Sequence, residues 1–425
     1  MTLEQRFERD LPLILDDIAM GPYPDYVDGV LSTTAQRRQR ASWTFPERWL
    51  PVELTTARVP QTRLPWRQVI VLVALIALLL AASALYIGSR QTTLPEPFGR
   101  ASNGLVAYAR DGDIYTVDPK TNRSTPITTG RDLDTSPTWS RDGTRLAFRR
   151  ETGASSVAYV VDADGRSAAP VSDPMRNMSE LAFSPDGSTV MFTAGTDELR
   201  ETWIANTTGK PDPRRIDVGM SMVSPTFRPP EGSEIIFANG SSVEQGRGIF
   251  AVNVKTGAVR TILPAEPGNF RDWIRVSPDG SHIAYSAATA SDVRNTFVVH
   301  IVGADGTGDR ALPMPERATF QDGPSWSNDS QRLAVARGYA DRNSDMALTV
   351  IPADGSSTGI ETERGLTGCC DTAVEWAPDD TVILVSPNDL DGVRKPQLLW
   401  NPETGATQVA PWGAKGDPAW QRTSR

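Results

Sequence analysis

The chain has 425 residues, with 34 glycines, 33 prolines and a hydrophobic fraction of 39%. Its net charge is −9, and because arginine and acidic residues balance within residues 1–67, the excess of acid lies in the rest of the chain. An acidic domain repels polyanions, so we expect no nucleic-acid partner.

Residues 1–66 are expected to form a cytoplasmic helical tail. Apolar residues recur at helical spacing over residues 3–18, and glycine and proline within residues 21–24 end this pattern. A second short helix is predicted over residues 25–40. Two short helices hardly make a core, so the tail either docks on a cytoplasmic partner or stays a membrane-surface or solvated segment.

Residues 67–89 are predicted to form one transmembrane helix. The run from Gln68 to Ser89 contains no charged residue, and roughly 20 apolar residues span the core of a bilayer. A buried core helix is the alternative. More arginines flank the N-terminal side of the run, so the positive-inside rule predicts a single-pass protein of the cell membrane with residues 90–425 outside the cytoplasm.

After a proline-containing linker over residues 90–102, one motif recurs along the chain. It consists of an aromatic or aliphatic residue, a polar turn that usually contains Asp-Gly, and an apolar strand. The copies are WSRDGTRLAF (139–148), FSPDGSTVMF (183–192), FRPPEGSEIIF (227–237), VSPDGSHIAY (276–285), WSNDSQRLAV (326–335) and WAPDDTVILV (376–385), with a half copy at Asp417–Trp420.

A second element, an alternating strand that runs into a tight turn, occurs seven times. Its first example, IYTVDPKTN (114–122), precedes the first copy of the motif, and each complete copy is followed by another example. Asp-Gly and Thr-Gly supply the positive φ angles that hairpin turns need. Four short strands in about 46 residues are typical of a propeller blade. We therefore predict an all-β protein with a seven-bladed β-propeller over residues 103–425, with six or eight blades as alternatives.

The two ends of the repeat region are complementary. Residues 103–108 match the second strand of a unit and lack a first strand, whereas residues 417–421 match a first strand alone. The last strand is therefore predicted to complete the first blade, which closes the ring and removes two exposed edges.

The succession of the Trp-Ser-x-Asp-Gly turn, the Leu-Ala-Phe strand and the Ile-Tyr-x-Val-Asp strand resembles the PD40, or TolB-like, propeller repeat over about residues 103–421. This resemblance implies a propeller fold and, in bacteria, often a location in the envelope, but it implies no single function. Seven repeats depart from TolB itself, which has six blades and a separate α/β domain. The overall layout also loosely resembles membrane-bound anti-sigma factors, although the tail lacks the His and Cys-x-x-Cys of their zinc-type domain.

Acidic residues mark the loops that lead into the predicted innermost strands. They occur in five of the seven blades, as Asp134, Asp272, Asp322, Asp371 and Asp417. A ring of carboxylates at one mouth of the channel would focus negative potential and attract a cation or a basic peptide. Aspartate is also a common turn former, which is the alternative explanation.

Cys369 and Cys370 lie in the same loop as Asp371 and are the only cysteines of the chain. Two adjacent cysteines give neither a disulfide framework nor a zinc site. They are either reduced thiols or a strained vicinal disulfide, and a redox change would reshape this mouth.

Candidates for catalysis are few. The Gly-x-Ser-x-Gly match at Gly355–Gly359 follows a hairpin turn and has no helix after it, unlike a nucleophile elbow. His282 and His300 lack the spacing of metal ligands. We expect a non-enzymatic protein, without a cofactor other than a bound cation, that binds a protein or small ligand outside the cytoplasm. The alternatives are an anti-sigma-like regulator, an envelope scaffold, and a propeller hydrolase or lyase.

Overall fold

The computed structural model describes residues 73–76, 98–196, 200–240, 245–289, 297–339, 346–362, 373–388 and 393–424. The chain divides into two units, residues 1–91 and 92–425. Val73–Ile76 are helical, and the predicted tail and the rest of the predicted span lie outside the described residues. Within the described ranges, no helix has the length and apolar character that crossing a membrane requires.

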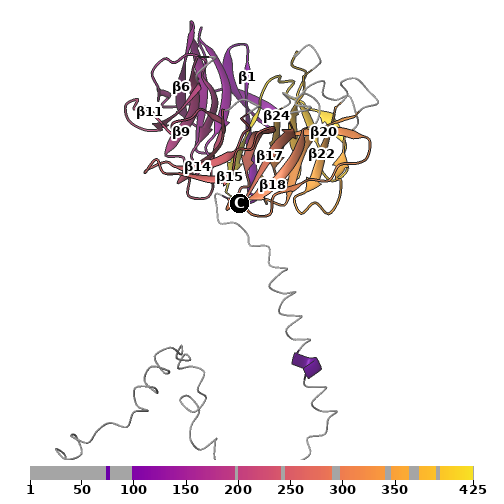
Figure 1. The fold of residues 1–425 in the computed structure, drawn as a ribbon. Helices are drawn as coiled ribbons and strands as arrows, with labels where there is room; N and C mark the ends of the chain where they lie inside the picture. The colour runs from indigo at the N-terminus through magenta and orange to yellow at the C-terminus, as the bar shows by residue number, and fades with distance from the viewer. Residues whose placement is uncertain are drawn as a thin grey trace, which may run out of the picture. The chain divides into compact units, whose positions relative to one another are not determined.

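The second unit is built from antiparallel sheets, and the described residues form seven of them, each with four strands (Figure 1). Each sheet is a blade, and the strand given first in each blade below is its innermost strand. Every innermost strand contacts the innermost strand of the next blade, and the series returns to its start, so the ring is closed. The predicted all-β propeller is confirmed, with seven blades rather than six or eight.

The blades follow the chain. Blade 1 contains β28 (Ala419–Thr423), β1 (Ser102–Arg110), β2 (Asp113–Asp118) and β3 (Arg123–Pro126). Blade 2 contains β4 (Leu133–Trp139), β5 (Arg145–Thr152), β6 (Ser155–Asp162) and β7 (Ala169–Pro170). Blade 3 contains β8 (Ser179–Phe183), β9 (Thr189–Gly195), β10 (Arg200–Asn206) and β11 (Arg214–Arg215).

Blade 4 contains β12 (Met222–Phe227), β13 (Glu234–Asn239), β14 (Ile249–Asn253) and β15 (Val259–Leu263). Blade 5 contains β16 (Asn269–Val276), β17 (His282–Thr289), β18 (Val298–Gly303) and β19 (Arg310–Ala311). Blade 6 contains β20 (Ala318–Trp326), β21 (Arg332–Tyr339), β22 (Met346–Pro352) and β23 (Ile360–Glu361). Blade 7 contains β24 (Ala373–Trp376), β25 (Ile383–Ser386), β26 (Leu398–Trp400) and β27 (Thr407–Val409).

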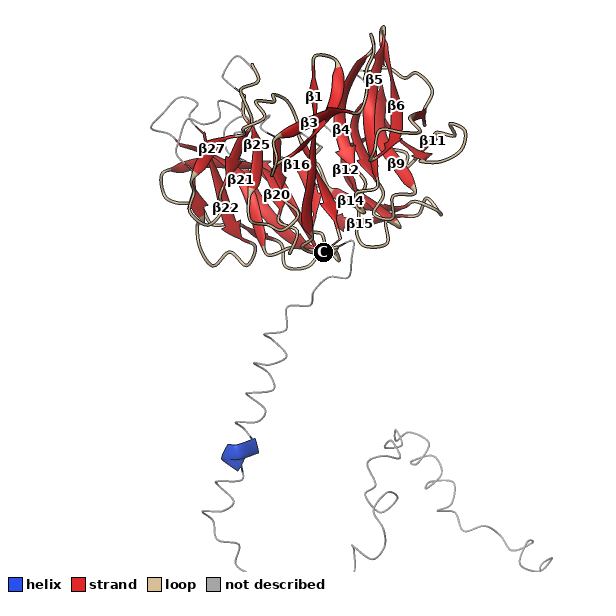
Figure 2. Cartoon of the chain, turned by 180° about the vertical axis from the view of Figure 1, so that it is seen from behind, coloured by secondary structure: helices blue, strands red, loops and turns tan. Residues whose placement is uncertain are grey.

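The second strand of a blade is apolar on both faces because a neighbouring blade covers each face. In β9 and β13, nearly every residue is buried, and the buried clusters join side chains of adjacent blades. Figure 2 shows the strands standing side by side around the domain with the loops at their two ends. The loops that connect the strands therefore gather at these two ends.

Tryptophans at the start of the repeated motif tie one blade to the next. The indole Nε1 of Trp326 donates to the carbonyl oxygen of Arg275 at 3.0 Å. The indole of Trp376 makes the equivalent bond to the carbonyl of Ser325 at 3.1 Å. These bonds confirm that the motif tryptophans lie between neighbouring blades.

The last strand completes the first blade, as predicted. β28 pairs antiparallel with β1, with Trp420 opposite Val106 and Ala419 opposite Ala107. The Gln421 side chain adds two bonds: Oε1 accepts from the backbone N–H of Leu105 at 3.0 Å, and Nε2 donates to the carbonyl of Gly143 in blade 2 at 2.7 Å. In Figure 1, the indigo start of this domain accordingly lies next to its yellow end.

Candidate functional site

The ring has two ends that differ in chemistry. We call the end at which the innermost strands begin the rim face, and the end at which the Ser-x-Asp-Gly turns follow those strands the turn face. Since neighbouring strands of a blade run antiparallel, Arg150 at the end of β5 and Arg247 just before β14 both lie at the rim face.

The predicted acidic residues lie at the rim face, and the described ones have partners within the protein. Asp134 is buried and accepts two bonds from Arg150, at 2.7 Å from Nε and 2.8 Å from Nη2. Asp272 accepts from Arg247 Nη1 at 2.9 Å and from Ser224 Oγ of blade 4 at 2.8 Å.

The remaining rim carboxylates follow the same arrangement. Asp322 is buried and accepts from Ser286 Oγ of the preceding blade at 2.5 Å. Asp417 pairs with Arg394 of blade 7, with 2.7 Å between Oδ1 and Nη1. Asp371, Cys369 and Cys370 lie outside the described residues. Arginine therefore compensates Asp134, Asp272 and Asp417, and binding of a cation or a basic peptide at this ring stays a prediction.

A repeated β-bulge explains why an acidic residue stands at this place. The innermost strands shift register near their start, where Ser136, Glu180, Ser224 and Trp273 have positive φ angles of 54°, 54°, 49° and 52°. Two of the acidic residues bond the backbone of the bulge directly: the N–H of Trp273 donates to Asp272 at 2.8 Å, and that of Gly323 donates to Asp322 at 2.7 Å. The bulge leaves a ladder N–H unpaired, and the carboxylate satisfies it.

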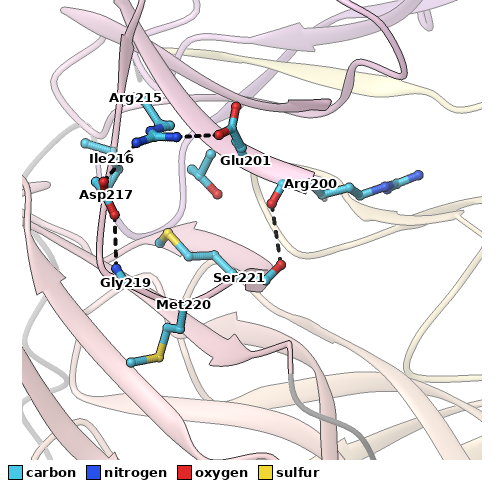
Figure 3. A pocket seen from close by; sticks show the side chains of 10 residues that line it. Arg200, Glu201, Arg215, Ile216, Asp217, Gly219, Met220 and Ser221 are labelled. Atoms are coloured by element: carbon cyan, nitrogen blue, oxygen red, sulfur yellow. Dashed lines mark hydrogen bonds and ion pairs between the residues drawn. The ribbon is translucent and has the colours of Figure 1, made fainter. Parts of the chain in front are cut away.

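A groove opens at the rim face between blades 3 and 4 (Figure 3). Its volume is about 330 Å³, close to the lower limit for small-molecule pockets. Arg215 forms ion pairs with Glu201 at 2.5 Å and with Asp217 at 2.9 Å. Met220, at 41% exposure, supplies an apolar side chain at the same groove.

Charged side chains also line the channel, and the sequence pattern did not identify them. Glu180 of blade 3 interacts with Arg275 of blade 5, although blade 4 lies between them in the ring, so both lie toward the axis. Both residues are exposed to solvent, but the strands around the channel surround their charged groups. This enclosure raises the pKa of Glu180 and lowers that of Arg275.

The turn face is occupied by the chain itself. Residues 98–101, predicted as part of a linker, form a strap that we call the N-terminal strap. Arg100 pairs with Asp329 at 2.6 Å and with Asp380 at 3.3 Å. The backbone N–H of Ala101 donates to the carbonyl of Pro378 at 2.8 Å, and the side chain of Phe98 is buried.

The two histidines have separate partners. His282 Nδ1 lies 2.7 Å from Ser281 Oγ, whereas His300 Nδ1 lies 3.1 Å from Asp309 Oδ1, which also accepts from the Tyr285 hydroxyl. Across the described ranges, no group of three or more His, Cys, Asp or Glu side chains could hold a metal ion. Gly355–Gly359 lies in the connection between β22 and β23.

Comparison with known proteins agrees with this architecture. The sequence model of the family described as the TolB beta propeller domain, PD40, matches residues 101–274. The Tol-Pal system protein TolB of Francisella tularensis is 24% identical over 218 residues, which cover 50% of this chain and 48% of that protein. An uncharacterized peptidase, YuxL, of Bacillus subtilis is 32% identical over 87 residues, 20% of this chain and 13% of that protein.

The chain thus spans about half, or less, of the length of these curated relatives. Among solved structures, an oligogalacturonate lyase from Vibrio parahaemolyticus superimposes with a TM-score of 0.53 at 13% identity, covering 73% of this chain and 86% of the lyase. At this identity, the likeness shows the fold alone. The domain described here is therefore a propeller with seven blades, and its residues 101–274 match the model of the TolB beta propeller domain, PD40.

Proposed function

We propose that this chain is a membrane-anchored envelope protein that binds a protein partner through the rim face of its propeller and has no enzymatic activity. The likeness to TolB, whose name assigns it to the Tol-Pal system, supports an envelope location. The uncharged run Gln68–Ser89 supports a single membrane span, with the propeller outside the cytoplasm.

The difference between the two faces carries this proposal. The N-terminal strap crosses the turn face and is held there by Arg100, so the chain covers part of this mouth itself. The rim face bears the groove beside Met220 and a set of arginines that carboxylates hold in place. A partner can approach the rim face without displacing any of these strap contacts.

The rim arginines combine charge with aromatic packing. The guanidinium carbon of Arg247 lies 3.9 Å from the centroid of the Phe270 ring, and that of Arg150 lies 4.6 Å from the centroid of Tyr159. Arginine and aromatic residues are enriched at the centres of protein interfaces. Because ion pairs already hold these side chains, binding costs little of their conformational entropy.

Site-directed photo-cross-linking tests the proposal. A benzophenone amino acid is placed at Met220 on the rim face and, as a matched control, at exposed Lys255 in the β14–β15 hairpin on the turn face. We expect a discrete protein adduct from position 220 in intact cells, lost when Arg215→Glu reverses a groove charge, and no adduct from position 255. Adducts at position 255 alone, or equal labelling at both positions, would contradict a rim-face interface.

Two further measurements separate the alternatives. Deletion of residues 1–60 is expected to abolish binding of a cytoplasmic partner and to leave the rim-face adduct intact; an unchanged set of cytoplasmic partners would favour a scaffold over an anti-sigma-like regulator. Turnover of peptides or oligogalacturonides by the purified protein would favour a hydrolase or lyase and would contradict the non-enzymatic proposal.

A further inference from the structure

A second, smaller cavity lies at the turn face where the last strand closes the ring. Its volume is about 170 Å³. The side chains that matter here come from three blades: Trp139 and Arg141 from blade 2, Glu375 from blade 7, and Trp420 and Arg422 from blade 1. We call it the closure cavity.

Two indole N–H groups at the closure cavity lack an acceptor among the described residues. Trp139 and Trp420 are 9% and 6% exposed, and neither Nε1 atom has a hydrogen-bond partner within the described part of the chain. Trp326 and Trp376, at the same position of the motif, each donate to a backbone carbonyl of the preceding blade. A buried donor without an acceptor costs about 1–3 kcal/mol, so a group inside the cavity would stabilise both indoles.

The guanidinium groups at the cavity add positive charge. Arg422 donates to two neutral oxygens, Asn328 Oδ1 at 2.7 Å and the carbonyl of Gly99 at 2.6 Å. Arg141 stacks on Phe98 of the N-terminal strap, with 5.6 Å between its guanidinium carbon and the ring centroid. Burial and the charge of Arg422 lower the pKa of Arg141 to about 9, and an anion between the two arginines would relieve this repulsion.

Acidic groups face the same cluster from blade 7. Glu375 lies in the cavity, accepts the backbone N–H of Trp420, and has a pKa raised to about 7 because protein surrounds it. Asp380 is held away from the cavity by the backbone and side-chain N–H groups of Asn328, at 2.7 and 3.0 Å, and by Arg100. Burial raises the pKa of both carboxyl groups, and that of Glu375 lies at about 7, so the charge of Glu375 changes near neutral pH.

The size of the cavity limits what it can hold. Pockets for drug-sized ligands have volumes of about 300–1,000 Å³, and one water occupies about 30 Å³ in the liquid. A volume of about 170 Å³ accommodates an ion of a few heavy atoms. Indole and guanidinium groups only donate hydrogen bonds, so the ligand must be an acceptor.

We propose that the closure cavity binds a small oxyanion, such as sulfate, phosphate or a short carboxylate, between Arg141, Arg422 and the indoles of Trp139 and Trp420. Such an ion would bridge the first two blades and the last strand, and it would tie the N-terminal strap to the closed ring through Arg141 and Arg422.

Indole NMR of the full-length protein in detergent tests this proposal, with sulfate as the probe because its charge stays constant across neutral pH. The resonances of Trp139 and Trp420 are assigned by their loss in Trp139→Phe and Trp420→Phe, which keep a large aromatic side chain at each position. We expect millimolar sulfate to shift these two indole resonances and to leave those of Trp326 and Trp376 in place.

Isothermal titration calorimetry then measures affinity. Removing a donor to an ion costs enough to weaken binding about tenfold, so we expect that loss for Arg141→Gln and a smaller one for Trp139→Phe. The control variant Arg200→Gln changes an arginine at the rim-face groove and should bind sulfate like the parent.

The affinity should also depend on pH. Sulfate should bind more tightly at pH 6 than at pH 8, on either side of the Glu375 pKa of about 7, and Glu375→Gln should abolish that difference.

Phosphate and acetate titrations show which oxyanions the cavity accepts. Binding of sulfate, phosphate or acetate that is weakened about tenfold in Arg141→Gln and less in Trp139→Phe supports the site. If none of them moves either indole resonance, the cavity holds ordered water only and the proposal is wrong. Equal affinity in Trp139→Phe, Arg141→Gln and Arg200→Gln would place any bound anion elsewhere and would equally overturn it.

Discussion

Trp420, in the last strand of the chain, lies directly opposite Val106 of β1 in the antiparallel ladder of blade 1. The same tryptophan packs in a buried cluster with Leu384 of blade 7. This side chain therefore contacts both the first and the last blade, and we expect the stability of the ring to depend on it.

Truncation of this side chain should weaken the whole domain. Trp420→Ala is expected to lower the free energy of unfolding by about 3–5 kcal/mol because it leaves a cavity among buried side chains. The measurement is urea denaturation followed by far-UV circular dichroism. Val409→Ala, at a position that is 61% exposed on neighbouring β27, should change stability by less than about 0.5 kcal/mol. Equal effects would show that β28 does not close the ring.

Glu234 should stabilise the propeller at neutral pH and lose this effect in acid. Hydrogen bonds from Arg260 and Arg228, against an opposing effect of burial, lower its pKa from 4.5 to about 2. A lowered carboxylate pKa stabilises the folded state above the unfolded pKa, and the stability falls as pH drops from about 4.5 toward 2.

Glu234→Gln should therefore be less stable at pH 7 by roughly 1–2 kcal/mol, after allowance for solvent around this partly exposed cluster. Its stability should also vary less with pH over the acidic range than that of the parent. Denaturation midpoints measured at a series of pH values give both results, and parallel pH profiles for variant and parent would contradict the assignment.

Glu375 should act in the opposite direction. Burial raises its pKa from 4.5 to about 7, so the folded state retains a proton that the unfolded chain has released. Its contribution to stability is fully present below pH 4.5, decreases as pH rises to about 7, and is constant above that. In buffers without oxyanions, Glu375→Gln should remove this decline, whereas Glu234→Gln should leave it unchanged.

Asp322 provides a test of the acidic rim. Its carboxylate accepts from Ser286 and from the bulge N–H of Gly323, so Asp322→Ala is expected to cost about 1–3 kcal/mol by leaving buried donors unpaired. Asp322→Asn retains one acceptor oxygen and should cost less. Calorimetric titration with calcium and with a basic peptide, compared between parent and Asp322→Asn, decides whether this residue also binds ligands; equal affinities would make its role structural alone.

Much of the fold could be predicted because each part of the repeat has a local cause. Gly143 has a φ of 69°, and a Cβ atom there would collide with the backbone of Arg422, so the Asp-Gly turn carries direct structural information. The missing strand in blade 1 likewise identified residues 417–421 as its complement. Both signals depend on a few neighbouring residues or on the count of strands.

The sites could not be predicted in the same way because they depend on which blades become neighbours. Asp272 and Arg247 belong to different blades, as do Asp417 and Arg394, and each pair forms only where two neighbouring blades pack together. The bulges have no consistent sequence signal either: Trp273 adopts a positive φ in which a bulky residue is rare.

The closure cavity shows the same limit most clearly. Trp139 and Trp376 stand in the same motif, yet only the indole of Trp376 finds a backbone acceptor among the described residues. The innermost strand that precedes Trp139 in the ring is β28, which comes from the far end of the chain. The motif alone therefore could not predict that these two indoles differ in their hydrogen bonding.

A closed ring underlies both faces and the closure cavity, and an engineered disulfide tests it most directly. Ser102 and Thr423 are antiparallel partners, and such pairs have Cα separations of about 4.5–5.5 Å, within the range of disulfides.

Ser102→Cys and Thr423→Cys are combined in a background in which Cys369 and Cys370 are replaced by serine, and free thiols are measured by maleimide labelling. We predict that mild oxidation removes both free thiols and that reductant restores them, whereas the pair Ser102→Cys and Ser356→Cys, the latter in the outer hairpin of blade 6, stays labelled. Persistent labelling of positions 102 and 423 in the folded protein would contradict the closed seven-bladed ring.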